Sequence, residues 1–307
     1  MNVTAICGGV GAAKLLIGLG RALGGTGLTA VVNTGDDDEI YGVHVAPDLD
    51  TVTYWLAGVA DFGRGWGIAG DTFDVVEGLR ELGEDAWFNL GDRDLATCIF
   101  RTSLLRAGAT LTEATRRVAD AFGLVPQVLP MTDDRVRTRV ACADGRTLSF
   151  QEYFVRERCE PEVTGVSFEG ADRAAPGPRV VESIASADAV VVCPSNPVVS
   201  VGPILAVPGV AAALAGHPFV VAVSPIVAGT AVKGPADRML ESLGHGSSAA
   251  SVARLYAGFC DHFVVDERDA AEVEPIRALG LECSALDTMM VDGTVSEKLA
   301  RDLVALR

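Results

Sequence analysis

Two aspartates separated by a single residue are the first groups in this sequence with the chemistry of a catalytic site. Asp48 and Asp50 stand in the segment Pro47-Asp-Leu-Asp-Thr51, at the start of an expected helix. An N-cap role explains one aspartate there but not two. A pair of carboxylates can ligate a divalent cation through oxygen atoms, or position an attacking hydroxyl group. Asp48 and Asp50 are therefore candidate catalytic residues and candidate metal ligands.

A glycine-rich turn near the N-terminus predicts an anion site. An apolar run over residues 3–7 leads into Gly8, Gly9 and Gly11, and a helical pattern follows with Lys14 in its first turn. Glycines let the backbone approach a ligand, and a helix N-terminus offers unpaired N–H groups. The pattern G-G-x-G-x-x-K is neither the dinucleotide fingerprint nor a Walker loop, so a plain strand-to-helix turn is the alternative. A phosphate is the expected occupant.

Other polar residues follow the expected strands, at the sheet edge where open α/β folds bind ligands. The acids at 36–38 after the second strand either line a site or form a solvated loop. The candidates for nucleotide and phosphate binding are Gly8, Gly9, Gly11, Lys14, Asn33, Thr34, Ser195, Asn196, Ser224, Lys233 and Gly234. This mixture of charges and glycines suits a nucleotide together with a polyhydroxyl substrate.

Three residues between 61 and 94 have two interpretations each. Trp66, in a glycine-rich loop, can stack on a flat ring or simply cover the core. Asn89 is expected where a strand ends, and Arg93 follows it between two acids at a helix start. Arginine there can bind a phosphate or carboxylate through two hydrogen bonds, or pair locally with a capping aspartate. We include Arg93 among the candidate catalytic residues.

Composition excludes several classes of protein. The chain has 307 residues, a net charge of −16 and 49% hydrophobic residues. The negative charge argues against non-specific nucleic-acid binding and against anionic membranes. Seven cysteines without a C-x-x-C pair indicate neither a disulfide framework nor a zinc site, and a cytoplasmic location is expected. None of the four histidines stands in a motif typical of catalysis.

Apolar runs alternating with helical patterns predict an α/β protein. We expect one Rossmann-like, three-layer domain over residues 1–307 with a mostly parallel sheet, and an antiparallel insertion at about 136–175 that serves as a lid or dimer element. Expected strands cover 3–7, 28–32, 127–130, 189–193, 219–223, 263–265 and 282–285. Thr110 and Glu113 have capping-box spacing before a helix to Phe122, with Thr112 as the alternative cap.

In this order the motifs resemble the 2-phospho-L-lactate transferase (CofD) family of coenzyme F420 biosynthesis, which includes relatives that use phosphoenolpyruvate. The resemblance covers nearly the whole chain. It rests on Gly8-Gly-Val-Gly11 with Lys14, Asn33-Thr34, Pro47-Asp-Leu-Asp50-Thr51, Trp66-Gly67, Leu90-Gly-Asp-Arg-Asp94, Leu129-Pro-Met-Thr-Asp133, Pro194-Ser-Asn-Pro197, Ser224-Pro-Ile226, Lys233-Gly-Pro-Ala236 and Val265-Asp-Glu-Arg-Asp269. Singly these motifs are weak, but together they are a strong match.

The resemblance implies a reaction. Lactyl or enolpyruvyl diphospho-5′-guanosine would donate its phospho-acid unit to the ribityl hydroxyl of the deazaflavin Fo, releasing GMP and giving F420-0 or its dehydro form. It also implies Mg²⁺, a homodimer and an Fo site at Asp50 and Asn89, although some relatives carry a basic residue at the second position. Gly9, Gly11, Asn196 and Lys233 would surround the guanylate.

Among the roles, Asp50, with Asp48, would hold Mg²⁺ or orient the hydroxyl. Lys14 and Arg93 would offset the charge that develops on the diphosphate. Trp66 joins the expected Fo contacts as a stacking residue.

Two other classes of protein compete with this hypothesis. One is the non-catalytic nucleotide-binding protein of the gluconeogenesis-factor or cell-shape type, which shares the glycine loop. Its counterpart of the Asp48–Asp50 segment lacks the second aspartate, so the pair favours the enzyme. The other is a nicotinamide dehydrogenase, which the imperfect glycine fingerprint and the absence of an obvious histidine base disfavour.

Overall fold

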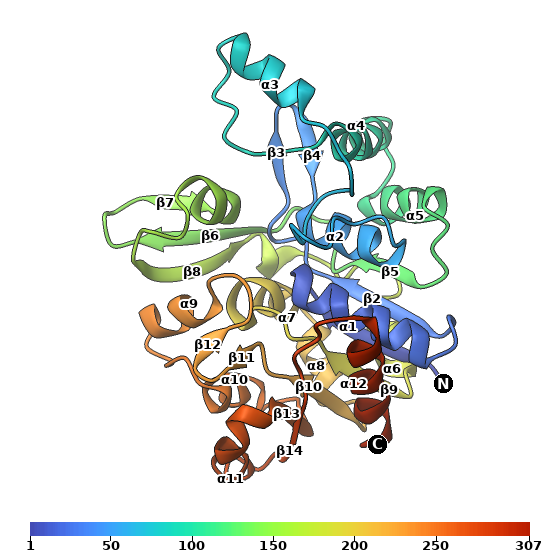
Figure 1. Cartoon of the computed structure of the whole chain (residues 1–307), viewed down its shortest axis with the longest axis vertical. Helices are drawn as coiled ribbons and strands as arrows, with labels where there is room; N and C mark the ends of the chain where they lie inside the picture. Colours follow the sequence, from blue (N-terminus) through green and yellow to red (C-terminus); the bar gives the residue numbers. More distant parts are fainter.

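A seven-stranded parallel sheet organises the computed structural model, which describes residues 1–307 (Figure 1). Its strand order is β14-β13-β10-β9-β1-β2-β5. The strands are β1 (Val3–Cys7), β2 (Leu28–Val32), β5 (Gln127–Pro130), β9 (Ala189–Val192), β10 (Val220–Val223), β13 (His262–Asp266) and β14 (Glu282–Leu286). Every pairing between these neighbours is parallel. The predicted mostly parallel α/β sheet is confirmed.

Helices cover both faces of this sheet and give the predicted three layers. Alternate strand residues enter different cores: Ile6 packs in one, whereas Ala5 and Cys7 pack in the other. The core with Ala5 contains side chains from α1 (Gly9–Ala22), α2 (Pro47–Leu56), α5 (Leu111–Ala121) and α12 (Gly293–Ala305). The core with Ile6 contains α6 (Val180–Ser186), α7 (Gly202–Ala206), α8 (Val210–Ala215), α9 (Ala236–Ser242), α10 (Ala249–Tyr256) and α11 (Val273–Arg277).

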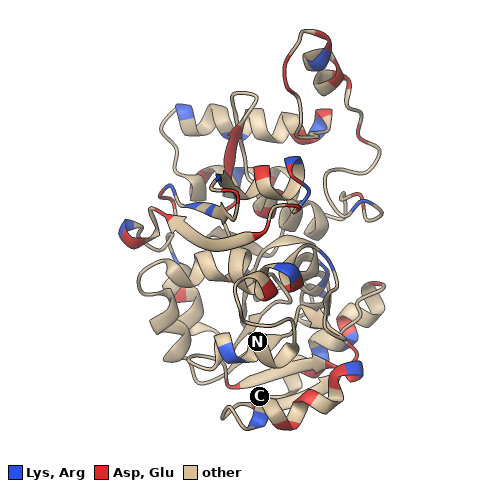
Figure 2. Cartoon of the chain, turned by 90° about the vertical axis from the view of Figure 1, so that its left-hand side faces the viewer, with Lys and Arg blue, Asp and Glu red and all other residues tan.

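The central strands are recognisable because both of their faces are buried. β9 and β10 consist only of valine and alanine, and all eight residues are buried. Such continuous β-branched runs are typical of parallel strands with helices on both sides. Figure 2 shows the corresponding pattern of charge, which lies mainly on helices and loops. No helix has the length and apolar character needed to cross a membrane.

Smaller antiparallel sheets stand apart from the central one. The predicted antiparallel excursion at 136–175 contains a sheet of β6 (Arg137–Cys142), β7 (Thr147–Ser149) and β8 (Val163–Glu169), in the order β7-β6-β8. The sequence did not predict the hairpin of β3 (Asp38–Ile40) and β4 (Val43–Val45), or the short pair β11 (Ile226–Val227) and β12 (Thr230–Ala231). Short π-helical turns at Glu152–Arg156 and Pro197–Val201, and 3-10 turns at Ala171–Arg173 and Glu267–Glu272, complete the chain.

The region between the β3–β4 hairpin and α5 contains one wrong prediction and one confirmed one. No strand ends at Asn89; residues 82–91 connect α3 (Asp74–Glu81) to α4 (Asp92–Arg106) without strand structure. Ala86 and Leu90 instead pack in a small separate core against the hairpin, where no strand of the central sheet is available for pairing. Before α5, Thr110 and Glu113 form the predicted capping box, so Thr112 is not the cap.

Candidate active site

A cavity of about 430 Å³ opens where the strand order of the central sheet reverses. β1 has β2 on one side and β9 on the other, so the loops after β1 and β9 separate there, and this is where open α/β sheets bind ligands. Both loops line the cavity, together with residues from α2, the 61–73 loop, the 150–155 segment and the 233–235 loop. The volume suits a small-molecule substrate.

The glycine-rich turn is held tightly at the base of this cavity. The Ser195 hydroxyl accepts a hydrogen bond from the Gly8 N–H (3.1 Å) and donates one to the Gly8 carbonyl (2.9 Å). A Cβ atom on Gly8 would lie 2.5 Å from Asp48 Oδ2, and one on Gly11 would lie 2.5 Å from the Pro194 carbonyl oxygen. A side chain at position 11 would meet rigid backbone, and one at position 8 would displace the Asp48 carboxylate. The turn thus joins the ends of β1 and β9 at one place.

Asp48 and Asp36 are buried carboxylates that face the same cavity. Helix α2 begins at Pro47 with Ala46 as its cap residue, so neither Asp48 nor Asp50 caps it. Asn33 Nδ2 donates to Asp48 Oδ2 over 2.9 Å. Burial raises the pKa of Asp48 to about 6, and repulsion from Asp37 adds to the shift. Burial and repulsion from Asp48 raise the pKa of Asp36, whose Oδ1 has no hydrogen-bond partner.

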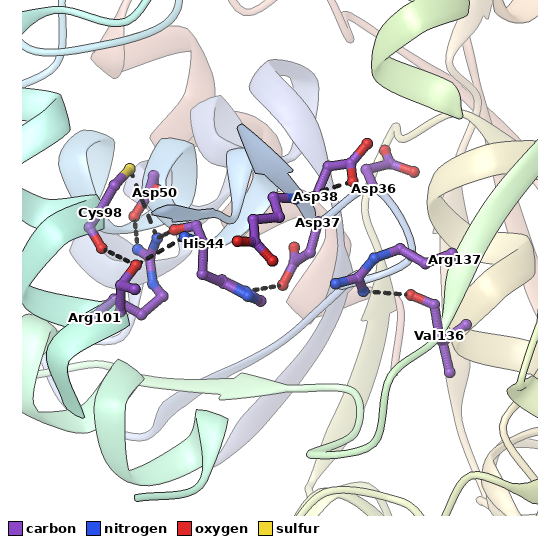
Figure 3. A network of polar contacts seen from close by, with 12 residues as sticks. Asp36, Asp37, Asp38, His44, Asp50, Cys98, Arg101, Val136 and Arg137 are labelled. Atoms are coloured by element: carbon purple, nitrogen blue, oxygen red, sulfur yellow. Dashed lines mark hydrogen bonds and ion pairs between the residues drawn. The ribbon is translucent and has the colours of Figure 1, made fainter. Parts of the chain in front are cut away.

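Asp50 has a different partner from Asp48, because residues two apart on a helix point in different directions. Its carboxylate forms a buried ion pair with the guanidinium of Arg101 on α4 (Figure 3). Arg101 Nη1 also donates to the carbonyl of His44, whose ring nitrogen lies 2.9 Å from Asp37 Oδ2. Burial raises the pKa of Asp50, and Arg101 opposes that shift. The ion pair holds the Asp50 carboxylate against α4 and opposes its protonation.

Asp94 is a fourth buried carboxylate on the cavity wall, after Asp36, Asp48 and Asp50. The Tyr54 hydroxyl donates to its Oδ1 over 2.8 Å, and burial, with repulsion from Asp50, raises its pKa to about 7. Ligand atoms of Asp50, Asp94 and Cys98 lie within 4.8 Å of one another. Asp50 therefore has Asp94 and Cys98 as its nearest potential co-ligands, while Asp48 has Asp36 as its acidic neighbour.

Two cationic side chains border the cavity beside the glycine turn. Lys233 Nζ donates to the Arg64 carbonyl over 3.0 Å and so joins the 233–235 loop to the 61–73 loop. Partial burial and repulsion from Lys14 lower the pKa of Lys233. The Arg64 guanidinium lies 5.0 Å from the centre of the Trp66 ring. A site that combines backbone N–H groups with these cations and buried carboxylates can bind a phosphorylated ligand and position a hydroxyl group against it.

Comparison with known proteins identifies the family. The model of the family described as 2-phospho-L-lactate transferase CofD matches residues 3–303. The chain belongs to this family. It is 44% identical over 313 residues to a phosphoenolpyruvate transferase of Streptomyces griseus, covering 100% of this chain and 98% of the relative. It is 41% identical over 297 residues to a 2-phospho-L-lactate transferase of Methanosarcina mazei, covering 97% of each. The predicted family and the predicted transferase class are confirmed.

A solved structure shares the fold of this CofD-family chain. The crystal structure of a UPF0052 family protein from Bacillus halodurans superposes with a TM-score of 0.69, covering 99% of this chain and 98% of the other. Its sequence identity of 16% makes this a similarity of fold alone.

The structure brings most of the predicted site residues of this CofD-family chain to one cavity. Those that line it are Gly8, Gly9, Gly11, Asp48, Asp50, Trp66, Asn89, Ser195, Asn196, Lys233 and Gly234. The lining does not include Lys14, Asn33, Thr34, Arg93 or Ser224. Asn33 instead holds Asp48, Ser224 hydrogen-bonds within its own turn to Ile226, and Arg93 is exposed with a hydrogen bond to the Ala69 carbonyl.

Several residues that line or support the cavity are not predicted by the sequence. Arg101 belongs to the buried face of α4 with Asp94 and Cys98, at helical spacings of four and three residues. A charged residue at such a position indicates a buried partner, but nothing local names that partner as Asp50. Phe150 and Phe154 also line the cavity; they lie four residues apart in the antiparallel region, where the alternation of apolar residues predicts a hairpin and not a helical turn.

Proposed function

We propose that this protein transfers the phospholactyl or phosphoenolpyruvyl group of lactyl or enolpyruvyl diphospho-5′-guanosine to the ribityl hydroxyl of Fo. GMP leaves, and the product is F420-0 or dehydro-F420-0. The observation that carries the proposal is that the glycine turn and the Arg101-paired Asp50 face one cavity. The names of the curated relatives, which specify both acids, support a phospho-acid donor without deciding between the two.

The acceptor hydroxyl is assigned to Asp50. In the reaction the hydroxyl oxygen forms a bond to phosphorus, the bond from that phosphorus to the GMP oxygen breaks, and the hydroxyl proton is released. Asp50 accepts a hydrogen bond from the hydroxyl and aims its oxygen at the phosphorus. Because Arg101 holds the carboxylate from the side of α4, the cavity-facing part of Asp50 is preorganised before substrate binds.

The diphosphate of the donor is assigned to the glycine turn and Lys233. The N-terminus of α1 begins at Gly9 and offers backbone N–H groups, and Lys233 supplies a positive charge at the same wall. Charge builds on the departing GMP phosphate as the bond breaks, so donors already in place at this wall stabilise it. Lys14, whose charge lowers the pKa of Lys233, adds to the positive potential from outside the cavity lining.

The carboxylates beside the glycine turn fit a magnesium ion. Asp36 and Asp48 are both buried, and their carboxylates repel each other when both are charged. Asp36 Oδ1 has no hydrogen-bond partner. Mg²⁺ prefers carboxylate oxygens and diphosphate oxygens, and when bound it would neutralise charge on the donor. We therefore assign the metal to Asp48 with Asp36, rather than to the pair Asp48 and Asp50 that the sequence suggested. Without a cation, Asp48 would repel the diphosphate.

Fo-dependent release of GMP tests the proposal. The protein is incubated with each guanylylated donor and Mg²⁺, with and without Fo, and GMP is quantified by chromatography. Release that requires Fo supports the transferase, and the donor that reacts names the acid. Nucleotide binding with no Fo-dependent GMP would instead indicate the non-catalytic gluconeogenesis-factor type of function. The homodimer implied by the family stays a prediction, which light scattering of the same preparation tests.

A further inference from the structure

Two phenylalanines form an aromatic platform on one wall of the cavity. The rings of Phe150 and Phe154 stack in parallel, with centroids 5.5 Å apart and planes 6° apart. Both residues line the cavity. Phe150 is 9% exposed and Phe154 is 39% exposed. One ring is therefore set into the protein, and the other offers apolar surface to whatever occupies the cavity.

The platform is held by the antiparallel region around it. Phe150 packs in a small core with Tyr153 and with Val199, which comes from the other π-helical turn on the cavity wall. The Ser149 N–H donates to Glu152 Oε2 (2.7 Å), and the Glu152 N–H donates to Ser149 Oγ (3.2 Å). These contacts fix the start of the turn that carries Phe154, so the platform does not have to be ordered by ligand.

A hydrogen bond connects the platform to the acidic side of the site. Gln151, a buried residue that directly follows Phe150 in the sequence, donates from Nε2 to the backbone carbonyl of Asp36 over 3.4 Å. Asp36 in turn interacts electrostatically with Asp48. The position of the aromatic rings is thus coupled to the loop that carries the proposed metal ligand.

The other exposed aromatic ring of the cavity is already in contact with a cation. The Arg64 guanidinium lies 5.0 Å from the centre of the Trp66 ring, and Phe73 meets the same ring edge-on at 6.3 Å. A flat neutral ring placed on Trp66 would compete with Arg64, whereas Phe154 has only Phe150 as an aromatic partner. Phe154 is therefore the better stacking surface.

We propose that the Phe150–Phe154 platform binds the tricyclic ring of the acceptor and makes Phe154 a specificity-determining residue for Fo. This rests on the proposed function, because it assigns the acceptor ring to one wall of the same cavity. A planar aromatic ring gains stacking energy and apolar contact on Phe154, and its polar ribityl chain is left free to reach Asp50. The antiparallel region would then serve as the acceptor-binding element of the fold.

Equilibrium dialysis against Fo, read by absorbance, tests the platform in four proteins. These are the wild type, Phe154→Ala, Phe154→Tyr and the control Phe100→Ala, which removes a ring of similar exposure (38%) outside the cavity. We expect Phe154→Ala to weaken Fo binding by roughly tenfold to a hundredfold, as for a lost stacking partner. Phe154→Tyr and Phe100→Ala should bind Fo like the wild type. GMP binding should be the same in all four proteins.

The outcomes separate this inference from the proposed function. If the wild type binds Fo and Phe154→Ala binds it equally well, the platform is overturned and the proposed transferase function is unaffected. A wild-type protein that does not bind Fo at all would overturn the proposed function and the platform together. Thermal unfolding of each variant checks that the fold is retained.

Discussion

Removing Arg101 should destabilise the protein strongly because it leaves the Asp50 carboxylate buried without a cation. Side-chain exposures in this ion pair are 2% for Arg101 and 7% for Asp50, so little solvent reaches the place that the guanidinium occupies. Breaking a buried pair by removing one partner costs about 3–5 kcal/mol. For Arg101→Met we expect a loss of that size in the free energy of unfolding, and a fall of roughly 10 °C in melting temperature.

The double variant Asp50→Asn/Arg101→Met separates stability from turnover. It removes both charges, so most of the lost free energy should return, since a buried pair contributes little compared with a neutral pair of similar volume. Turnover should not return, because the amide that replaces the Asp50 side chain lacks the carboxylate assigned to the acceptor hydroxyl. A loss of about 100-fold or more in kcat is expected for a missing group of this kind.

Urea unfolding, monitored by circular dichroism, measures the free energy of unfolding of each variant. It is done at pH 8, where the unpaired Asp50 carboxylate destabilises the folded state most. Arg139→Met serves as the control, because its pair with Glu169 is solvent-exposed and should contribute less than about 1 kcal/mol. The reasoning is refuted if Arg101→Met costs no more than Arg139→Met. It is also refuted if the double variant turns over at the wild-type rate.

Three further predictions follow from the same cavity. In EDTA, the free energy of unfolding should fall as pH rises from about 5 to 8, because the folded-state pKa values of Asp48 (about 6) and Asp94 (about 7) lie above the ordinary aspartate value of 3.8, so the folded form binds these protons more tightly. Urea titrations at each pH should show a loss of roughly 1–2 kcal/mol over this range for Asp48 alone, and a flat profile would contradict the prediction. Omitting Mg²⁺ should weaken the binding of GDP, which carries a diphosphate like the donor, more at pH 8 than at pH 5.5, because Asp48, with its pKa of about 6, is charged at the higher pH. Calorimetry measures both affinities, and equal losses at the two pH values would argue against a metal at Asp48. Gly11→Ala should cost about 1–3 kcal/mol and weaken GDP binding, because its Cβ would lie 2.5 Å from the rigid Pro194 carbonyl, and unchanged melting and binding would show that the turn tolerates a side chain.

The sequence predicts the central sheet well because its strands depend on local composition. β9 and β10 are unbroken runs of valine and alanine, and burial on both faces is the only environment that suits them. The capping box before α5 is also local, since Thr110 and Glu113 are three residues apart. The glycine-rich turn can also be predicted locally, from the three glycines between a strand and a helix. Its contact with Ser195 cannot, because Gly8 and Ser195 are 187 positions apart.

What the sequence could not predict depends on contacts between distant segments. Asp50 and Arg101 are separated by 51 positions, and no spacing rule pairs them. The strand predicted to end at Asn89 is wrong because the apolar and aromatic composition of residues 86–90 is the same for a strand and for a buried loop. Here the segment packs on the core of the β3–β4 hairpin and not in the central sheet. Similarly, Phe154 becomes a cavity residue only because a π-helical turn places it on Phe150.

The mass of the compound formed from Fo is the most decisive measurement on this protein. Wild-type enzyme, Fo, Mg²⁺ and both guanylylated donors in equal amounts are incubated together, and the deazaflavin fraction is analysed by mass spectrometry. We predict a product heavier than Fo by one phospho-acid unit, with one molecule of GMP released for each product molecule, and the mass identifies the preferred acid. Recovery of Fo at its original mass, whether or not GMP is released, would contradict phospho-acid transfer to the ribityl hydroxyl.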